Sequence, residues 1–131
     1  MEKSWMRPVG AALVVLVTAF LALDAGMKIA GVAAAVDATR ELGFSPVATR
    51  TIGLILAIAT LVYVVPVTRI LGAVLLTGYL GGAVAIQAAN GSPLATHILF
   101  GVYVGAAVWA SIWLRNAQIR SLLPLAQRAD A

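Results

Sequence analysis

The sequence predicts an all-α integral membrane protein, a four-helix bundle that forms a single four-span domain over residues 1–131. Its composition and the length of its uncharged segments lead to this prediction. Of the 131 residues, 62% are hydrophobic and only 11% are charged, and the mean hydropathy is +1.00. Soluble domains contain about 45–50% apolar and about 25% charged residues, so this excess requires a solvent other than water. The composition therefore excludes an ordinary water-soluble domain.

Four segments are long and apolar enough to cross a bilayer as helices: 8–30, 51–68, 70–89 and 95–114. The last three contain no Asp, Glu, Lys or Arg. The first carries Asp24 and Lys28, and it spans the membrane if both charges lie near one end. About 20 consecutive apolar residues cross the hydrocarbon core, and a helix satisfies its own backbone polar groups there.

The first segment has an alternative interpretation as a cleaved signal peptide, in which Lys3 and Arg7 would form the basic region. No small-x-small cleavage triplet lies around residues 23–25. A mature chain beginning there would also lose one helix of the bundle. We therefore interpret 8–30 as the first span.

The distribution of basic residues predicts the orientation of the bundle. With four spans, both termini lie on the same side, and that side carries six basic residues against three on the other. The six are Lys3, Arg7, Arg69, Arg115, Arg120 and Arg128, and the three are Lys28, Arg40 and Arg50. Because cytoplasmic ends carry the excess of Lys and Arg, the sequence predicts an N-in, C-in topology.

The three connections differ in length and kind. Residues 31–42 have an apolar face at helical spacing, and Gly43 and Pro46 follow as stop signals, which predicts a short helix at the outer interface between the first and second spans. Pro66 lies at a tight turn between the second and third spans. The segment 90–93 (Asn-Gly-Ser-Pro) is a loop of turn residues before the fourth span.

Four polar residues are predicted to lie near the outer leaflet: Asp24, Lys28, Arg50 and His97. Asp24 and Lys28 are four residues apart and share a helix face, so they form either a structural salt bridge or one side of a polar pocket. His97 shares a helical face with Gly101 and Gly105, which directs it toward the bundle. Gln87 reaches a similar depth but aligns with leucines and is the weaker candidate.

Small residues predict where helices approach closely. Gly78 and Gly82 form one GxxxG pair, and Gly101 and Gly105 form another. In lipid such pairs favour helix contacts. The alternative is that Gly81 and Gly82, with Tyr79, form the wall of a ligand pocket.

The chain has no cysteine and only one histidine. This excludes disulfides and thiolate chemistry, and one histidine cannot supply both axial ligands of a haem. No carboxylate cluster accompanies His97, so we predict no metal site. Because no nucleic-acid motif is present, the net charge of +4 is attributed to membrane topology.

The sequence resembles the DoxX-like family of small four-helix bacterial membrane proteins. The segments that carry the resemblance are FLALDAGMK (20–28), ELGFSP (41–46), RTIG (50–53), VVPVTRILGAVLLTGYLGGAVA (64–85) and THILF (96–100), with Trp113, Leu114 and Arg115 near the end. The resemblance implies a multi-pass protein of the bacterial inner membrane. Better-known relatives, DoxX and DoxD, are associated with quinone-linked redox systems, including thiosulfate:quinone oxidoreductase.

The leading hypothesis is a protein that binds a small hydrophobic or quinone-like ligand as the membrane partner of a redox system. Asp24, Lys28, Arg50 and His97 would form the polar end of its pocket. A small membrane enzyme acting on a lipophilic substrate, with His97 or Asp24 as general acid or base, stays open. So does a transport or scaffold protein without chemistry, and so does the choice between a homo-oligomer and a redox-enzyme partner.

The predicted topology can be tested by labelling. Cysteines introduced one at a time at Ser92 and Arg120 should react with a membrane-impermeant thiol reagent from opposite sides of the membrane, because the four-span arrangement separates them. The unsubstituted chain is a clean background, since it has no cysteine. Labelling of both positions from the same side would contradict the four-span arrangement.

Overall fold

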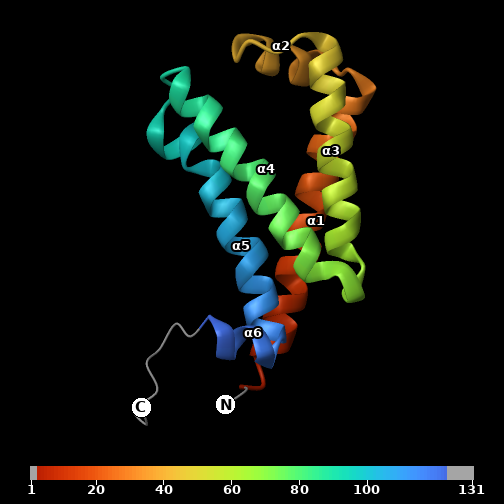
Figure 1. Cartoon of the computed structure of the whole chain (residues 1–131), viewed down its shortest axis with the longest axis vertical. Helices are drawn as coiled ribbons and strands as arrows, with labels where there is room; N and C mark the ends of the chain where they lie inside the picture. The colour runs from red at the N-terminus through yellow and green to blue at the C-terminus, as the bar shows by residue number, and fades with distance from the viewer. Residues whose placement is uncertain (1–2, 124–131) are drawn as a thin grey trace.

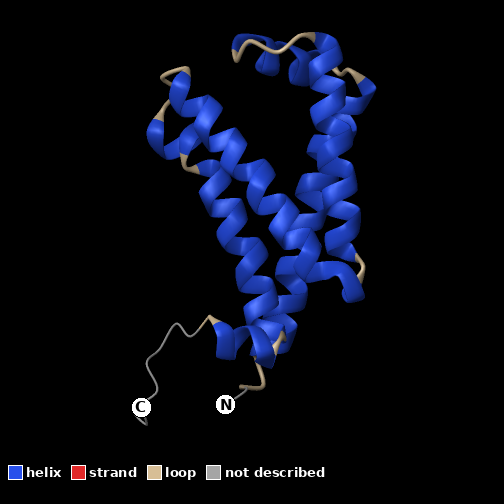
Figure 2. Ribbon diagram, viewed as in Figure 1, coloured by secondary structure: helices blue, strands red, loops and turns tan. Residues whose placement is uncertain are grey.

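The computed structural model describes residues 3–123; Arg128, which entered the charge count, lies outside them. The described part is helical throughout its regular structure, without a strand (Figure 2). The elements are α1 (Met6–Ala30), α2 (Ala33–Glu41), α3 (Pro46–Val64), the 3-10 turn η1 (Pro66–Thr68), α4 (Arg69–Ala89), the π-helical turn η2 (Leu94–Ile98), α5 (Phe100–Arg115) and α6 (Ala117–Leu122). The all-α prediction is confirmed.

Four of the helical segments are long and apolar enough to cross a membrane: Met6–Ala30, Pro46–Val64, Pro66–Ala89 and Leu94–Arg115. The second begins five residues earlier than the uncharged run that starts at residue 51, and it ends at residue 64 rather than 68. Its start is set by capping, because the Ser45 hydroxyl accepts a hydrogen bond from the Ala48 N–H at 3.1 Å and Pro46 occupies the first helical position. Its end is set by Pro66, which holds Val65 in an extended conformation.

The four long helices form a ring in which α1 and α4 each pack against α3 and α5. The backbones of α1 and α4 do not come into contact across the ring. Figure 1 shows the helices close together at the end where α1 begins and α5 ends, which we call the terminal end. The pair α4 and α5 then diverges from the pair α1 and α3 toward the opposite end, which carries α2.

Packing at the terminal end centres on Tyr63 of α3, whose side chain is fully buried. Its hydroxyl forms a hydrogen bond of 2.6 Å with the hydroxyl of Ser111 on α5, which is also fully buried. On α4, Gly72 lies directly against the Tyr63 backbone, so that any side chain there would collide with it. Tyr63 therefore joins three helices at one level.

The opposite end is organised by α2. Gly31, at φ 70°, ends α1 by donating its N–H to the Lys28 carbonyl, and α2 then runs across the end of the bundle (Figure 1). The buried hydroxyls of Thr39 on α2 and Thr49 on α3 form a hydrogen bond of 2.5 Å. This bond attaches α2 to α3.

The glycines of the two GxxxG pairs have different surroundings. A Cβ atom added at Gly101 would lie 2.8 Å from a methyl of Val84 and 3.1 Å from the Leu80 carbonyl oxygen, so the predicted tight contact is present there. At Gly78 and Gly82 the added Cβ would have no neighbour within 4 Å. The expectation that Gly78 and Gly82 pack against another helix was wrong, because α4 has already diverged from α3 at their level.

Three glycines that were not predicted from the sequence also lie at close helix contacts: Gly10 between α1 and α5, Gly53 between α3 and α1, and Gly72 between α4 and α3. At Gly53 an added Cβ would lie 2.7 Å from the Lys28 Cβ and 3.1 Å from the Ile29 backbone nitrogen. None of these belongs to a GxxxG pair. The GxxxG motif therefore marks small residues on a helix. The places where two helices cross decide which of these residues touch the neighbouring helix.

These contacts predict a contrast between two substitutions in α4. Gly72→Leu should lower the unfolding free energy by at least about 1–3 kcal/mol, because the new side chain has no volume to occupy beside the Tyr63 backbone. Gly82→Leu should change it little, because the position faces open space. Thermal unfolding in detergent measures both. Equal losses of melting temperature for the two variants would contradict the separation of α3 and α4 at Gly82.

Candidate functional site

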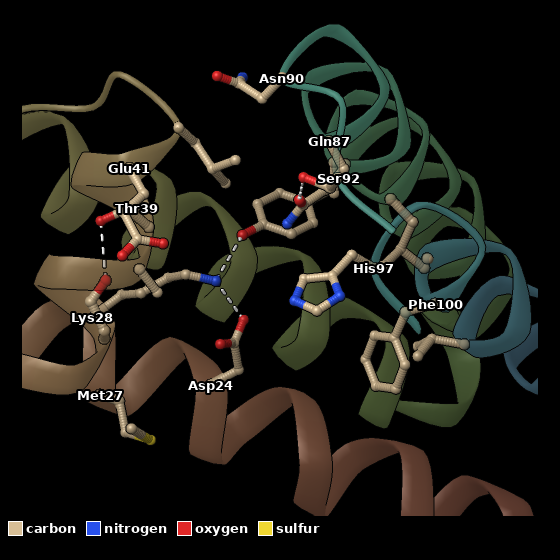
Figure 3. A pocket seen from close by; sticks show the side chains of 18 of the residues that line it. Asp24, Met27, Lys28, Thr39, Glu41, Gln87, Asn90, Ser92, His97 and Phe100 are labelled. Carbon is tan, nitrogen blue, oxygen red and sulfur yellow. Dashed lines mark hydrogen bonds and ion pairs between the residues drawn. The ribbon is translucent and has the colours of Figure 1, made fainter. Parts of the chain in front are cut away.

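A cavity of about 630 Å³ occupies the space between α1, α2, α4, η2 and α5 at the α2 end. Its lower wall is apolar and includes Phe20, Leu21, Leu80, Phe100 and Val104. Phe20 and Phe100 contact each other edge to face, with ring centroids 5.3 Å apart. Polar side chains gather above this wall, and Figure 3 shows them converging on one volume from different elements.

Lys28 lies at the centre of the polar part. Its Nζ donates hydrogen bonds to the Asp24 carboxylate at 2.5 Å and to the Tyr79 hydroxyl at 3.3 Å (Figure 3). The side chain of Lys28 is 13% exposed and that of Asp24 is 35% exposed. The contact to Tyr79 crosses the ring from α1 to α4, two helices whose backbones do not touch.

The side chains of Lys28, Asp24 and Tyr79 can still form hydrogen bonds with a further molecule. An ammonium has three donors, and the structure describes two acceptors for that of Lys28, so one N–H is available to the cavity. Tyr79 accepts from Lys28 and keeps its own hydroxyl proton to donate. Because Asp24 neutralises Lys28, the cluster carries donors without a net charge.

His97 reaches the cavity from the π-helical turn η2, and its side chain is exposed. Its Nδ1 is 2.8 Å from the Thr96 hydroxyl, which orients the ring. The predicted α-helical register from His97 to Gly101 is interrupted, because the wider turn of η2 ends at Ile98 before α5 begins. His97 and Gly101 still line the same cavity, but Gly105 does not.

Arg50 does not join this cluster. It lines neither of the two cavities at this end, and its guanidinium lies against Gly31, where an added Cβ would be 3.2 Å from a guanidinium nitrogen. This places the cation at the C-terminus of α1, where the helix dipole favours positive charge. The sequence placed Arg50 at the correct end of the bundle, but depth alone does not give the direction of a side chain.

The structure brings two of the three residues predicted to form the pocket wall, Tyr79 and Gly82, to one cavity. Tyr79 lines the large cavity and also a second, smaller cavity of about 370 Å³ between α2, α3 and α4, which Gly82 lines as well. Gly81 lines neither. Adjacent positions on a helix point about 100° apart, and Gly81 points away from the side of α4 on which Gly82 lines the smaller cavity.

Other polar residues line the cavity that the sequence did not predict there or, for Gln87, indicated only as a weaker candidate. Gln87 lines both cavities, and its side-chain oxygen accepts a hydrogen bond of 2.6 Å from the Ser92 hydroxyl. Thr39 and Glu41 enter from α2, and Asn90 enters from the turn after α4. The helical spacing within 31–42 predicted a helix but not that it would lie over the opening of the bundle.

Residues 3–123 do not bring together a set of side chains that could hold a metal ion. Within that range no group of three or more His, Cys, Asp and Glu side chains is placed to hold an ion. Asp24 is engaged by Lys28, and Asp37 forms an ion pair with Arg40 on the exposed face of α2.

The fold and the cavity define a multi-pass helical membrane protein with a partly polar, open cavity at one end of its bundle. A family model described as the DoxX-like family matches residues 12–111. The chain belongs to the DoxX-like family. No curated protein and no solved structure matched it.

The pairing of Asp24 and Lys28 predicts a non-additive effect on stability. Asp24→Ala should destabilise the protein by less than the about 3–5 kcal/mol of a fully buried pair, because Asp24 is 35% exposed and water screens part of the interaction. The double variant Asp24→Ala, Lys28→Ala should recover most of that loss, because it also removes the unpaired ammonium. Thermal unfolding of the two single variants and the double variant in detergent measures the coupling, and strictly additive losses would contradict it.

Proposed function

We propose that this DoxX-like protein binds a small lipophilic molecule with an uncharged, quinone-like polar head in the 630 Å³ cavity, and that it serves as the membrane partner of a redox enzyme. The observation that carries the proposal is the Asp24, Lys28 and Tyr79 cluster above an apolar wall. Small-molecule sites commonly have about 300–1,000 Å³ and combine apolar walls with a few polar groups. The cavity has this size and composition.

The charge of the cluster favours an uncharged head over an anion. A ligand carbonyl could accept hydrogen bonds from the remaining Lys28 N–H and from the Tyr79 hydroxyl. An anion would have to compete with Asp24 for Lys28 at a site where Asp24 already supplies a negative charge. A ring that bears carbonyl oxygens and rests on Phe20 and Phe100 satisfies both the polar and the apolar parts.

The composition of the chain is the reason for proposing a redox partner. With no cysteine and one histidine, the sequence provides neither a thiolate-ligated cluster nor two haem ligands of its own. In the proposal, electrons therefore reach or leave the bound molecule through another protein. With the N-in, C-in topology in the bacterial inner membrane, the cavity would open at the outer leaflet.

Binding tests the proposal with a matched pair of variants. The probe is a dimethoxy-methyl-benzoquinone carrying a decyl chain, measured by equilibrium binding to purified protein in nanodiscs after subtraction of empty nanodiscs. Tyr79→Phe should weaken binding roughly three- to tenfold, because it removes one hydrogen bond and keeps the ring. Tyr103→Phe is the control: Tyr103 is 51% exposed on α5, lines neither cavity, and loses the same atom.

Two results would count against the proposal. The first is absence of saturable binding to the unsubstituted protein. The second is an equal effect of the two tyrosine substitutions, because that would mean the probe associates with the lipid-facing surface instead of the cavity.

A further inference from the structure

The second cavity adjoins the first. The two share the wall residues Lys28, Thr39, Leu42, Tyr79, Ala83 and Gln87. The smaller one then continues between α3 and α4, where its own lining residues are Phe44, Ile52, Gly78, Gly82 and Ile86. The Lys28 and Tyr79 hydrogen bond therefore lies where the two cavities meet.

The smaller cavity has open space beside Gly78 and Gly82. Gly78 and Gly82 are exposed on α4, a helix long and apolar enough to cross the membrane, and an added Cβ at either would meet nothing within 4 Å. In Figure 1, α3 and α4 are close at the terminal end and separate toward the α2 end; Gly78 lies at the middle of α4 and Gly82 in its second half. An opening at this level of a membrane-spanning helix would face the lipid chains.

The chemistry of the two cavities differs. The larger cavity has polar side chains toward its mouth, including Glu41, Asn90 and Ser92. The residues that belong to the smaller cavity alone carry no charged or hydrogen-bonding side chain. Consider a ligand whose polar head lies at Tyr79. Its hydrocarbon chain would be unfavourable beside the polar side chains of the larger cavity and favourable beside the apolar side chains of the smaller one.

We propose that the ligand carries a single long hydrocarbon chain, and that this chain leaves the head site between α3 and α4 over Gly78 and Gly82. The inference rests on the proposed function, because it places the polar head at Lys28 and Tyr79. It adds the class of ligand, an amphiphile with one chain. It also gives the two glycines a role, which is to leave the groove empty of side chains.

The experiment compares two probes that differ only in the chain. One is the dimethoxy-methyl-benzoquinone ring without a side chain, and the other is the same ring with a decyl chain. The ratio of their dissociation constants is measured for the unsubstituted protein, Gly78→Leu, Gly82→Leu and Gly81→Leu, with empty nanodiscs subtracted. Gly81→Leu is the matched control, since Gly81 is also exposed on α4 with open space around it but lines neither cavity.

In the unsubstituted protein and in Gly81→Leu, with each dissociation constant referred to the free probe in water, the decyl probe should bind at least about tenfold more tightly, because several methylenes leave water for the groove. In Gly78→Leu and Gly82→Leu this ratio should fall toward one, because leucine fills the path of the chain. Thermal unfolding in detergent confirms that each variant is folded.

Three outcomes overturn the inference, and they are distinguishable. A ratio near one in the unsubstituted protein, with both probes bound, means that no chain is recognised and leaves the proposed function intact. An unchanged ratio in Gly78→Leu and Gly82→Leu, or an equal fall in Gly81→Leu, means that the chain takes another path. Failure of both probes to bind the unsubstituted protein removes the proposed function together with the inference.

Discussion

Tyr63 holds the terminal end of the bundle together, and the shape of the other end depends on it. Its backbone rests against Gly72 of α4, and its hydroxyl is bonded to Ser111 of α5. In a bilayer, helices gain no hydrophobic free energy by leaving lipid for each other, so close packing and interhelical hydrogen bonds must hold them together. At Tyr63 both kinds of contact occur at one level, while Gly53 keeps α3 against α1 and Gly101 keeps α5 against α4 nearer the α2 end. The two pairs of helices can therefore separate from each other there.

That separation creates an environment in which a lysine can lie within a membrane-spanning helix. Lys28 is nearly buried, and its charge is met by Asp24 on its own helix and by Tyr79 across the ring. Each partner satisfies one donor of the ammonium at a depth where an unpaired charge would be costly. Because the pair is neutral and still has donors to offer, the site suits a polar group without a charge.

The contrast between Gly72 and Gly82 shows how the same residue type serves two purposes on one helix. Gly72 allows α4 to touch α3, and ten residues later Gly82 lines a groove after the two helices have parted. The presence of small residues in a membrane helix is therefore compatible with contact and with open space. The crossing angle of the helices decides between them.

The sequence by itself determined the class of protein, because long uncharged runs have only one favourable solvent. It also determined the four spans, the DoxX-like family and the placement of Asp24, Lys28 and His97 at one end, since depth along a helix follows from counting residues. The direction of each side chain was decided by the tertiary structure. The π-helical turn set the position of His97, the close contact at Gly31 took Arg50 out of the cluster, and α2 brought Thr39 and Glu41 over the cavity. Rotation about a helix axis and the angle between helices depend on contacts between residues far apart in the chain, and those contacts leave no periodic pattern in the sequence.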